Sequence, residues 1–420
     1  MNHVAVVDLG YGDAGKGTVV DWLCATRPVH TVVRFNGGAQ AAHNVVLRDG
    51  RHHTFAQFGA GTFHPGVGTH LSRHVVVDPL ALAAEADHLA TVGVRDALDR
   101  LTVDGDALLA TPYHRAANRA REIARGADRH GSCGLGVGEA VAYGLAHPDD
   151  APRVADCHHP ALLRRRLAAL RDRLTAELGP LDAPPIEDCL PAFTGFAGRV
   201  AIVDGDWLGG ALRTGTCVFE GAQGVLLDEW HGFHPYTTWS TTTFANVDGL
   251  LAEAGRPGDV TRIGVLRLVT TRHGPGPLVT EDPGLPLADP HNPTNPWQGR
   301  FRFGHFDAVA HRYALAAAGG VDGLALTHLD LAGPDLRICR RYDTTDRLTP
   351  GPPGDLNRQA ALTARLLRSR PVYDDEPQDW PAAVSEELDT PVVLTSQGPT
   401  ADDKAPHGPL LAPPALARTA

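Results

Sequence analysis

A glycine-rich segment between an apolar run and a helical pattern constrains this chain more than any other feature. Residues 4 to 9 form a short, β-branched apolar run, typical of a buried strand, and glycines follow at positions 10, 12, 15 and 17. A helical pattern covers residues 19 to 25, and a second apolar run covers residues 32 to 35. A strand, a glycine turn, a helix and another strand indicate a βαβ unit, because parallel strands need a crossover connection.

Further apolar runs extend this unit into a long α/β chain. Buried strands are expected at residues 75–77, 200–203, 218–220, 263–269, 323–327 and 392–395, and helices at 79–92, 161–177, 307–318 and 357–368. Residues 274–295, rich in proline and polar side chains, predict a long surface loop. We therefore expect one α/β domain over residues 1–404, with a large, mostly parallel central sheet flanked by helices and with long loops. A Pro/Ala-rich tail, residues 405–420, is expected to fray.

Charge and hydropathy exclude several classes of protein. The formal net charge of −11 argues against a nucleic-acid partner, because binding to phosphates needs a basic surface. The chain has no run of about 20 apolar residues that could span a bilayer and no basic N-terminal region typical of a secretion signal. We expect a cytoplasmic protein that binds neither nucleic acid nor membranes. The six cysteines lie far apart without a Cys-x-x-Cys pair, which favours reduced thiols over disulfides or a zinc site.

Residues 10 to 18 have the composition of a phosphate-binding loop. Glycines let backbone amides turn inward around an anion, and the N-terminus of the following helix adds positive potential. Lys16 is one of only two lysines in the chain, and a lysine at this position can reach terminal phosphates. The pattern is similar to Gly-x4-Gly-Lys-Ser/Thr, except that Gly17 occupies the position of the hydroxyl residue. We predict phosphate contacts at Gly12, Gly15, Lys16 and Gly17.

Asp13 is unusual because a carboxylate inside an anion-binding loop repels phosphates unless it has a chemical task. It either coordinates Mg²⁺ or acts as a base on a substrate held against the terminal phosphate. The simplest alternative is that Asp13 caps the following helix. The sequence around it favours one of the two chemical roles.

The segment from Gly12 to Gly17, followed by the run from Val33 to His43, resembles the adenylosuccinate synthetase family, whose members join IMP and aspartate by using GTP. Similar segments follow in the family's order at residues 219–228, 231–238, 270–281, 327–330 and 396–399. The resemblance extends from about residue 4 to about residue 400. It implies the P-loop NTPase-like α/β fold of that family.

The resemblance also implies a mechanism. Asp13 would take the proton from N1 of a 6-oxopurine, so that O6 attacks the γ-phosphate of GTP and forms a 6-phosphoryl intermediate, from which an amine displaces phosphate. Lys16 and Mg²⁺ would neutralise charge on the transferring group. Asp13 and the backbone carbonyl of Ala42 would bind the metal. His43 would donate a hydrogen bond to the phosphates or to O6, and Gln223 would complete the catalytic set.

Each substrate is assigned a set of residues by the same resemblance. For IMP the residues are Asp13, Gln40, Cys133, Arg153, Gln223 and Thr238; for GTP they are Gly12, Gly15, Lys16, Gly17, Arg302, His328, Asp330, Ser396 and Gly398; and for L-aspartate they are Gln298, Arg300 and Arg302.

Several of these residue types suit their assigned ligands. An amide such as that of Gln223 can both donate to and accept from the edge of a 6-oxopurine, and a carboxylate such as that of Asp330 accepts from the N–H groups of guanine. The guanidinium groups of Arg300 and Arg302 can bind a carboxylate bidentately. Arg153 resembles an arginine supplied by the neighbouring subunit, so the resemblance implies a homodimer.

The sequence departs from the family at substrate-binding positions. Residues 132–135 read Ser-Cys-Gly-Leu where the family has Thr-Thr-Gly and a basic residue, so the monophosphate site loses donors. Gln40 stands in place of an asparagine, and His328 in place of a lysine beside guanine. Residues 296–298, Pro-Trp-Gln, precede Gly299 where two threonines are expected.

These departures leave alternatives open for the substrates and the activity. The chain is either a purine-pathway ligase acting on IMP and L-aspartate, or a relative that uses a modified purine nucleotide or a different amino donor. A non-catalytic nucleotide-binding homologue is a third reading. The retention of Asp13, Lys16, His43 and Gln223 favours an enzyme, because a mere binder needs neither a base nor a histidine facing phosphates.

Overall fold

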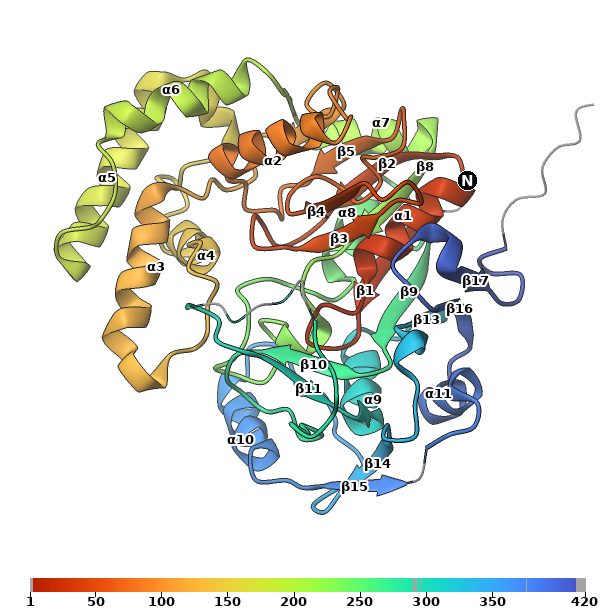
Figure 1. The fold of residues 1–420 in the computed structure, drawn as a ribbon. Coiled ribbons are helices and arrows are strands. Elements are labelled where there is room, and N and C mark those ends of the chain that lie inside the picture. The colour runs from red at the N-terminus through yellow and green to blue at the C-terminus, as the bar shows by residue number, and fades with distance from the viewer. Residues whose placement is uncertain (1–2, 290–291, 293, 295, 375, 413–420) are drawn as a thin grey trace, which may run out of the picture.

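A central sheet organises the molecule (Figure 1). The computed structural model describes residues 3–289, 292, 294, 296–374 and 376–412. Within these residues the sheet has ten strands in the order β17-β16-β13-β9-β1-β8-β2-β5-β6-β7, all paired in parallel except β16 with β17. Its strands are β1 His3–Asp8, β2 Val29–Arg34, β5 Gly68–Leu71, β6 Leu101–Asp104, β7 Ala201–Val203, β8 Thr216–Glu220, β9 Val260–Arg267, β13 Gly323–Thr327, β16 Val392–Ser396 and β17 Lys404–Pro406.

Smaller sheets and the helices surround the central sheet. The smaller sheets are β3 His43–Val46 with β4 His52–Phe55, β10 Thr270–His273 with β11 Phe301–Gly304, and β12 Phe306–Asp307 with β14 Ile338–Tyr342 and β15 Pro371–Asp374. The α-helices are α1 Lys16–Thr26, α2 Pro79–Thr91, α3 Pro112–Arg125, α4 Val137–Ala146, α5 Pro160–Leu178, α6 Ile186–Ala197, α7 Asp206–Thr214, α8 Ala245–Glu253, α9 Ala308–Ala317, α10 Leu356–Leu366 and α11 Trp380–Leu388. Short 3₁₀ helices cover Gly126–Asp128, Val154–His158, Val225–Leu227, Leu329–Leu331 and Ala401–Asp403.

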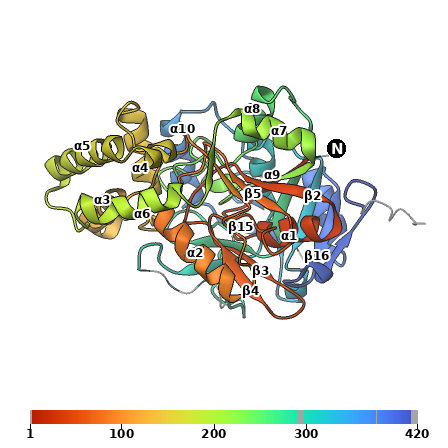
Figure 2. The same ribbon diagram turned by 90° about the horizontal axis from the view of Figure 1, so that it is seen from above.

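The two faces of the sheet are covered by separate hydrophobic cores. Side chains alternate along a strand, so Val4 and Val6 of β1 enter one core with residues of α1 and α2, whereas Ala5 and Val7 enter the other with residues of α7, α8 and α9. Seen from above, α7 and α8 lie on one side of the sheet, and α1, α2 and the β3–β4 hairpin lie on the other (Figure 2). The expected α/β class with a large, mostly parallel sheet is confirmed.

The N-terminal βαβ unit forms as predicted, with one strand inserted. β1 and β2 are both parallel to β8, which lies between them. β9 and then β13 follow on the other side of β1. Because ligands of open parallel sheets bind beyond the carboxyl ends of the strands, this order brings the loops after β1, β8, β9 and β13 to one site.

Most of the other elements predicted from periodicity also form, with shifted ends. The predicted helices correspond to α2, α5, α9 and α10, and the long loop between β10 and β11 contains no helix or strand over its described residues. No helix of the described chain is long and apolar enough to cross a membrane. All six cysteines are free.

Some expectations are wrong. Residues 75–77 form no strand: Val76 and Val77 make only isolated bridges, and Asp78 already caps α2. β7 lies at the edge of the sheet, so its residues are exposed or half-buried and not buried as expected. The first residues of the predicted tail pack on the domain, because Ala405 and Pro406 pair with β16 and Leu411 is fully buried. Residues 413–420 of the predicted tail lie outside the described residues.

Candidate active site

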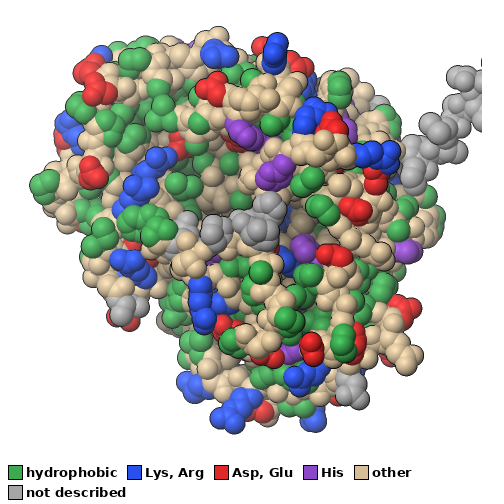
Figure 3. All heavy atoms as spheres, in the orientation of Figure 1, with side chains coloured by type: hydrophobic (Ala, Val, Ile, Leu, Met, Phe, Trp, Pro, Cys, Tyr) green, Lys and Arg blue, Asp and Glu red, His purple; other side chains and the backbone are tan. Residues whose placement is uncertain are grey.

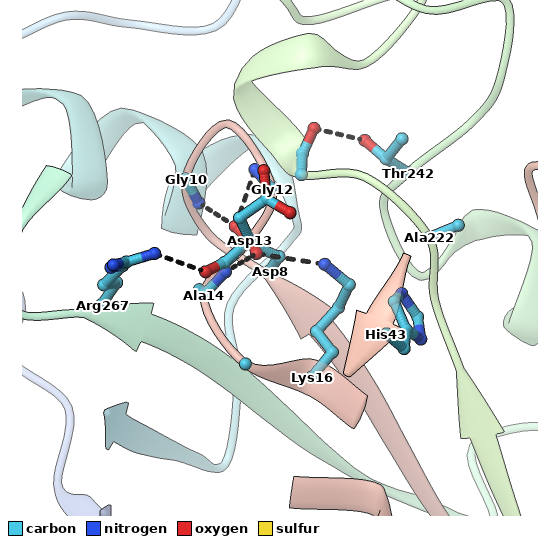
Figure 4. Close-up of polar contacts among 12 residues, drawn as sticks. Asp8, Gly10, Gly12, Asp13, Ala14, Lys16, His43, Ala222, Thr242 and Arg267 are labelled. Carbon is cyan, nitrogen blue, oxygen red and sulfur yellow. Dashed lines mark hydrogen bonds and ion pairs between the residues drawn. The ribbon is translucent and has the colours of Figure 1, made fainter. Parts of the chain in front are cut away.

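The carboxylate of Asp8, the last residue of β1, holds the phosphate loop through hydrogen bonds (Figure 4). Oδ1 of this buried side chain accepts hydrogen bonds from the amides of Gly10 at 2.8 Å and Gly12 at 3.3 Å. Oδ2 accepts from the amide of Ala14 at 3.0 Å and from Nζ of Lys16 at 3.1 Å. Asp8 therefore fixes the turn of the loop and the direction of the Lys16 ammonium group.

Close packing explains why the loop has a glycine where a hydroxyl residue was expected. A Cβ atom at Gly17, in the first turn of α1, would lie 2.7 Å from Cβ of His43 on β3. A Cβ atom at Gly224, in the loop after β8, would lie 2.2 Å from the carbonyl oxygen of Gly10. The phosphate loop is thus packed against both neighbouring segments too tightly for a side chain at either position.

His43 is oriented by Glu220 at the end of β8. Nδ1 of His43 lies 2.6 Å from Oε1 of Glu220, whose Oε2 accepts from the amide of Ala60 at 2.9 Å. Burial lowers the pKa of His43 in spite of the adjacent carboxylate. Burial alone would raise the pKa of Glu220, but the charges of His43 and Arg34 outweigh it and lower that pKa. The ionised Glu220 accepts from Nδ1, which leaves Nε2 of His43 for a ligand.

Asp13 has a left-handed backbone, with φ of 59°, and contacts two other elements. Its Oδ2 lies 3.3 Å from Nε2 of His273 on β10. Its carbonyl oxygen accepts from Nη1 of Arg267 on β9 at 3.3 Å (Figure 4). Burial would raise the pKa of Asp13, but the hydrogen bond with His273 and the charges of Lys16 and Arg267 hold it below its ordinary value. Helix α1 is capped by Gly15 without a side-chain hydrogen bond, so the helix-capping alternative for Asp13 is wrong.

A cavity of about 1130 Å³ joins these groups. It corresponds to the hollow in the middle of the face in Figure 3. The predicted site residues that line it are Gly12, Asp13, Gly15, Lys16, Gly17, Gln40, Ala42, His43, Cys133, Gln223, Thr238, Gln298, His328, Asp330, Ser396 and Gly398. The cavity therefore brings together residues that are up to 386 positions apart in the chain, from Gly12 to Gly398.

Two amide side chains in this cavity have buried oxygens without a hydrogen-bond partner among the described residues. They are Oε1 of Gln40 and Oε1 of Gln223. Gln223 has a left-handed backbone, with φ of 57°. Since an unpaired buried acceptor costs about 1–3 kcal/mol, both amides are available to a ligand that donates hydrogen bonds.

The end of the cavity near β13 and β16 carries no charged histidine. Burial, with the charges of Arg267 and Lys404, lowers the pKa of His328 to about 3, and its Nδ1 lies 2.9 Å from Oγ1 of Thr327. His328 is therefore neutral, unlike the lysine that the family has at this position. Lys404 donates to the carbonyl oxygen of Gly398 at 3.1 Å, which holds that backbone at the cavity wall.

Three predicted arginines do not line the cavity. Arg302 donates through Nη1 to the carbonyl oxygens of Gly274 and Gly276, at 2.9 Å each, and through Nη2 to Glu281 at 2.5 Å. Arg300 is two-thirds exposed and pairs with Glu281 at 3.3 Å.

Arg153 lies in a separate depression with Arg73, His74 and Asp106, where it donates to the carbonyl oxygen of Asp106 at 2.6 Å. In the structure, none of these three arginines therefore faces the cavity in which its predicted ligand would bind.

Three residues of the site were missed in the sequence. Asp8 had a local signal, since an aspartate ends the strand directly before the glycine turn. Glu220 and His273 belong to segments that resemble the family, but neither had a signal for its partner, because Glu220 is 177 positions from His43 and His273 is far from Asp13.

Comparisons with known proteins identify the family of the chain. The family model described as adenylosuccinate synthetase matches residues 5–403. An adenylosuccinate synthetase from Magnetococcus marinus is 32% identical, with 95% of this chain and 97% of the relative covered. One from Acidithiobacillus ferrooxidans is 33% identical, with 96% and 97% covered.

Two solved structures share the fold at 20% sequence identity. Fully ligated adenylosuccinate synthetase from Plasmodium falciparum has a TM-score of 0.80, with 97% of this chain and 100% of that chain covered. Succinoaminodeoxyadenylate synthetase of cyanophage S-2L, bound to dGMP and dATP, has a TM-score of 0.62, with 96% and 95% covered.

The phosphate loop, the cavity at the carboxyl ends of the strands and the relatives together define a ligase with a nucleotide-type site. The chain belongs to the adenylosuccinate synthetase family.

Proposed function

We propose that this protein is a GTP-dependent carbon–nitrogen ligase that joins IMP and L-aspartate to give adenylosuccinate, GDP and phosphate, in the cytoplasmic synthesis of AMP. The observation that carries the proposal is the carboxylate of Asp13, which is held ionised inside a phosphate loop beside Lys16. A loop that only bound phosphate would gain nothing from a negative charge at this position.

The proposed reaction has two steps. The ionised Asp13 accepts the proton from N1 of the 6-oxopurine, O6 attacks the γ-phosphorus of GTP, and GDP leaves. The amine of aspartate then attacks C6, the C6–O bond breaks, and phosphate leaves with the oxygen that was O6. The Lys16 ammonium stabilises the transferring phosphoryl group.

Two further side chains support these steps. His43 can donate from Nε2 only in its protonated form. Burial lowers its pKa, whereas the Glu220 carboxylate at Nδ1 and the phosphates of bound GTP oppose that shift and favour the proton. The unpaired amide oxygen of Gln223 lies at the cavity wall, where it can accept from the purine.

Mg²⁺ fits the donor set at the phosphate loop. The carboxylate of Asp13 and the backbone carbonyl of Ala42 are hard oxygen donors that belong to the same cavity as Lys16. Among the described residues no group of three or more His, Cys, Asp or Glu side chains could hold a metal, so an ion bound here would have to take its other ligands from water and phosphate. The bound ion would neutralise negative charge on the phosphates.

The base of GTP is assigned to the cavity end near β13 and β16. The exposed carboxylate of Asp330 can accept from the N–H groups of guanine, and the backbone around Ser396 and Gly398 completes the wall. Arg302, together with Gln298 and Arg300, is proposed to bind the amino acid once the loop between β10 and β11 rearranges.

The monophosphate of IMP is assigned to Cys133 and Thr238 and to Arg153 of a second subunit in a homodimer, and Gln40 is assigned to the same nucleotide. The depression that contains Arg153 lies outside the main cavity of its own chain, which supports a contact with a neighbouring molecule.

A second candidate function is ligation of a modified purine nucleotide or of a different amino donor. The observation that favours it is an aromatic side chain, Trp297, that packs against the other departure from the family at residues 132–135. A Cβ atom at Gly134 would lie 2.9 Å from the ring of Trp297, and Arg119 stacks on that ring at 5.3 Å. A bulky indole thus occupies the region where the family has small hydroxyl side chains.

Phosphate release distinguishes these candidates. IMP, GMP and modified purine nucleotides are each combined with L-aspartate and other amino acids, with GTP or ATP. We expect the largest rate with IMP, L-aspartate and GTP, whereas a larger rate with another combination would identify the second function. The Asp13→Asn variant should lose at least about 10²-fold in turnover and still bind nucleotide, because an amide cannot accept the purine proton. Phosphate release from none of the combinations would refute both functions.

A further inference from the structure

His273, which also lines the cavity, contacts the proposed catalytic base. It is the last residue of β10 and pairs with Phe301 on β11. Its Nε2 lies 3.3 Å from Oδ2 of Asp13. Both side chains are largely buried, with exposed fractions of 21% and 26%. The contact therefore joins the phosphate loop to an element that is about 260 residues later in the chain.

The imidazole ring of His273 is held in place by further contacts. Its centroid lies 4.6 Å from that of Phe301, and its Nε2 also lies 3.1 Å from Oδ1 of Asn292. A carboxylate has no hydrogen to give, so Nε2 carries the hydrogen and shares it between Asp13 and Asn292. Nδ1 of His273 is buried and has no partner among the described residues.

Within the described residues, His273 is the one side chain recorded in an ion pair or hydrogen bond with the Asp13 carboxylate. Arg267 contacts only the backbone carbonyl oxygen of Asp13, so this contact does not fix the orientation of the Asp13 carboxylate. A base must be aligned with the proton that it removes, and a displacement of about 1 Å can cost about 10²-fold in rate. A donor at Oδ2 would hold the carboxylate so that Oδ1 faces the substrate.

We propose that His273 is a positioning residue, which holds Oδ2 of Asp13 through Nε2 and directs Oδ1 toward N1 of the purine. This inference rests on the proposed role of Asp13 as the base. Its consequence is that loss of the Nε2 donor lowers kcat and leaves the KM values for the nucleotides nearly unchanged, because His273 acts on the base and not on substrate affinity.

The test compares two substitutions at one position. His273→Leu removes the donor, whereas His273→Gln can place an amide N–H near the position of Nε2. We expect kcat to fall about 10- to 100-fold in His273→Leu, with KM for the purine and for GTP changed less than about threefold, and to recover at least partly in His273→Gln. Equal losses in both variants, or an effect confined to KM, would overturn the proposal.

Asn292→Ala is the matched control, because it removes the other acceptor on the same Nε2 and leaves Asp13 in place. We expect its kcat to fall clearly less than that of His273→Leu, because the contact between His273 and Asp13 remains. A loss as large as that of His273→Leu would show that His273 acts through its contact with Asn292 and not through its contact with Asp13.

A double-mutant cycle separates this inference from the proposed function. If His273 acts through Asp13, then His273→Leu has no further effect on turnover in the Asp13→Asn background. Multiplying losses would overturn the positioning role and leave the ligase function intact. If the wild type turns over none of the purine and amine pairs, the proposed function fails. Crystal structures of the wild type and His273→Leu then test the contact directly: an unchanged Asp13 carboxylate would overturn the inference, and a rotated one would support it.

Discussion

The carboxylate of Glu220 accepts a hydrogen bond from Nδ1 of His43 at 2.6 Å and another from the amide of Ala60 at 2.9 Å. A negative charge at Nδ1 stabilises the protonated imidazole, from which Nε2 can donate to phosphate. His43 lies on β3 and Glu220 on β8, and both side chains are buried. The histidine thus depends on a carboxylate that does not itself line the cavity.

Replacement of Glu220 by glutamine should therefore lower kcat by about 10- to 100-fold, because the neutral amide no longer favours the charged imidazole. Burial lowers the pKa of His43, and the substitution removes the carboxylate that opposes this shift, so the variant loses its proton at a lower pH and the loss should be larger at pH 8 than at pH 6. Steady-state rates at both pH values check this expectation. Activity equal to that of the wild type at pH 8 would contradict the role of Glu220.

Gly17 should tolerate no side chain. Gly17→Ala would place a Cβ atom 2.7 Å from Cβ of His43, so the first turn of α1 or the hairpin of β3 must move. We expect a loss of about 1–3 kcal/mol in the free energy of unfolding and a large loss of turnover. Gly210→Ala is the control, because that helical glycine in α7 has nothing within 4 Å of an added Cβ and should become equally or more stable. Urea unfolding of both variants decides the matter, and equal stability of Gly17→Ala and the wild type would refute the packing argument.

The phosphate loop was predictable from the sequence because its determinants are local. A strand, the glycines and Lys16 lie within 20 residues, so periodicity and turn chemistry alone place the loop and the first helix. The insertion of β8 between β1 and β2 was not predictable, because strand order depends on pairings between distant segments. The same distance separates Glu220 from His43, and no local pattern marks that pair.

The arginines show a different limit. Arg302 was expected to face a ligand, but the pairing of β10 with β11 places its donors against the carbonyl oxygens of Gly274 and Gly276 and against Glu281. A sequence identifies guanidinium groups that can bind carboxylates, but the backbone course of the loop decides which acceptors they meet first.

The choice between phosphoryl donors should depend on Asp330. Asp330→Ala should lower the ratio of kcat/KM for GTP to that for ATP by at least about 10-fold, because guanine loses the acceptor for its N–H groups. Lys16→Ala should lower the rates with both donors and leave their ratio unchanged, because Lys16 contacts only the phosphates. Competition assays with the two nucleotides measure the ratio. An unchanged ratio in Asp330→Ala would show that another group reads the base.

Asp307 should make stability depend on pH. Burial raises the pKa of this carboxyl group to about 6, although it accepts hydrogen bonds from the amide of Ala310 at 3.0 Å and from the hydroxyl of Tyr342 at 2.7 Å. Since the folded state holds this proton more tightly than the unfolded chain, the free energy of unfolding falls as pH rises from about 4 to about 6 and stays lower above it. The shift of about 2 pH units corresponds to about 3 kcal/mol.

Asp307→Asn removes that charge and keeps an oxygen acceptor for Ala310. The variant should be more stable than the wild type at pH 8, and this advantage should shrink toward pH 4.5. Urea unfolding at the two pH values gives the comparison. A difference of the same size and sign at both values would mean that the titration of Asp307 does not affect stability.

The fate of the purine oxygen tests the central claim most directly. If O6 attacks the γ-phosphate, a 6-oxopurine nucleotide labelled with ¹⁸O at O6 must pass its label to the released phosphate, because the amine displaces that oxygen from C6. Mass spectrometry of the phosphate formed from labelled IMP, GTP and L-aspartate measures the transfer. The account predicts one labelled oxygen in each phosphate released with product, whereas unlabelled phosphate would show that water attacks GTP and that no 6-phosphoryl intermediate forms.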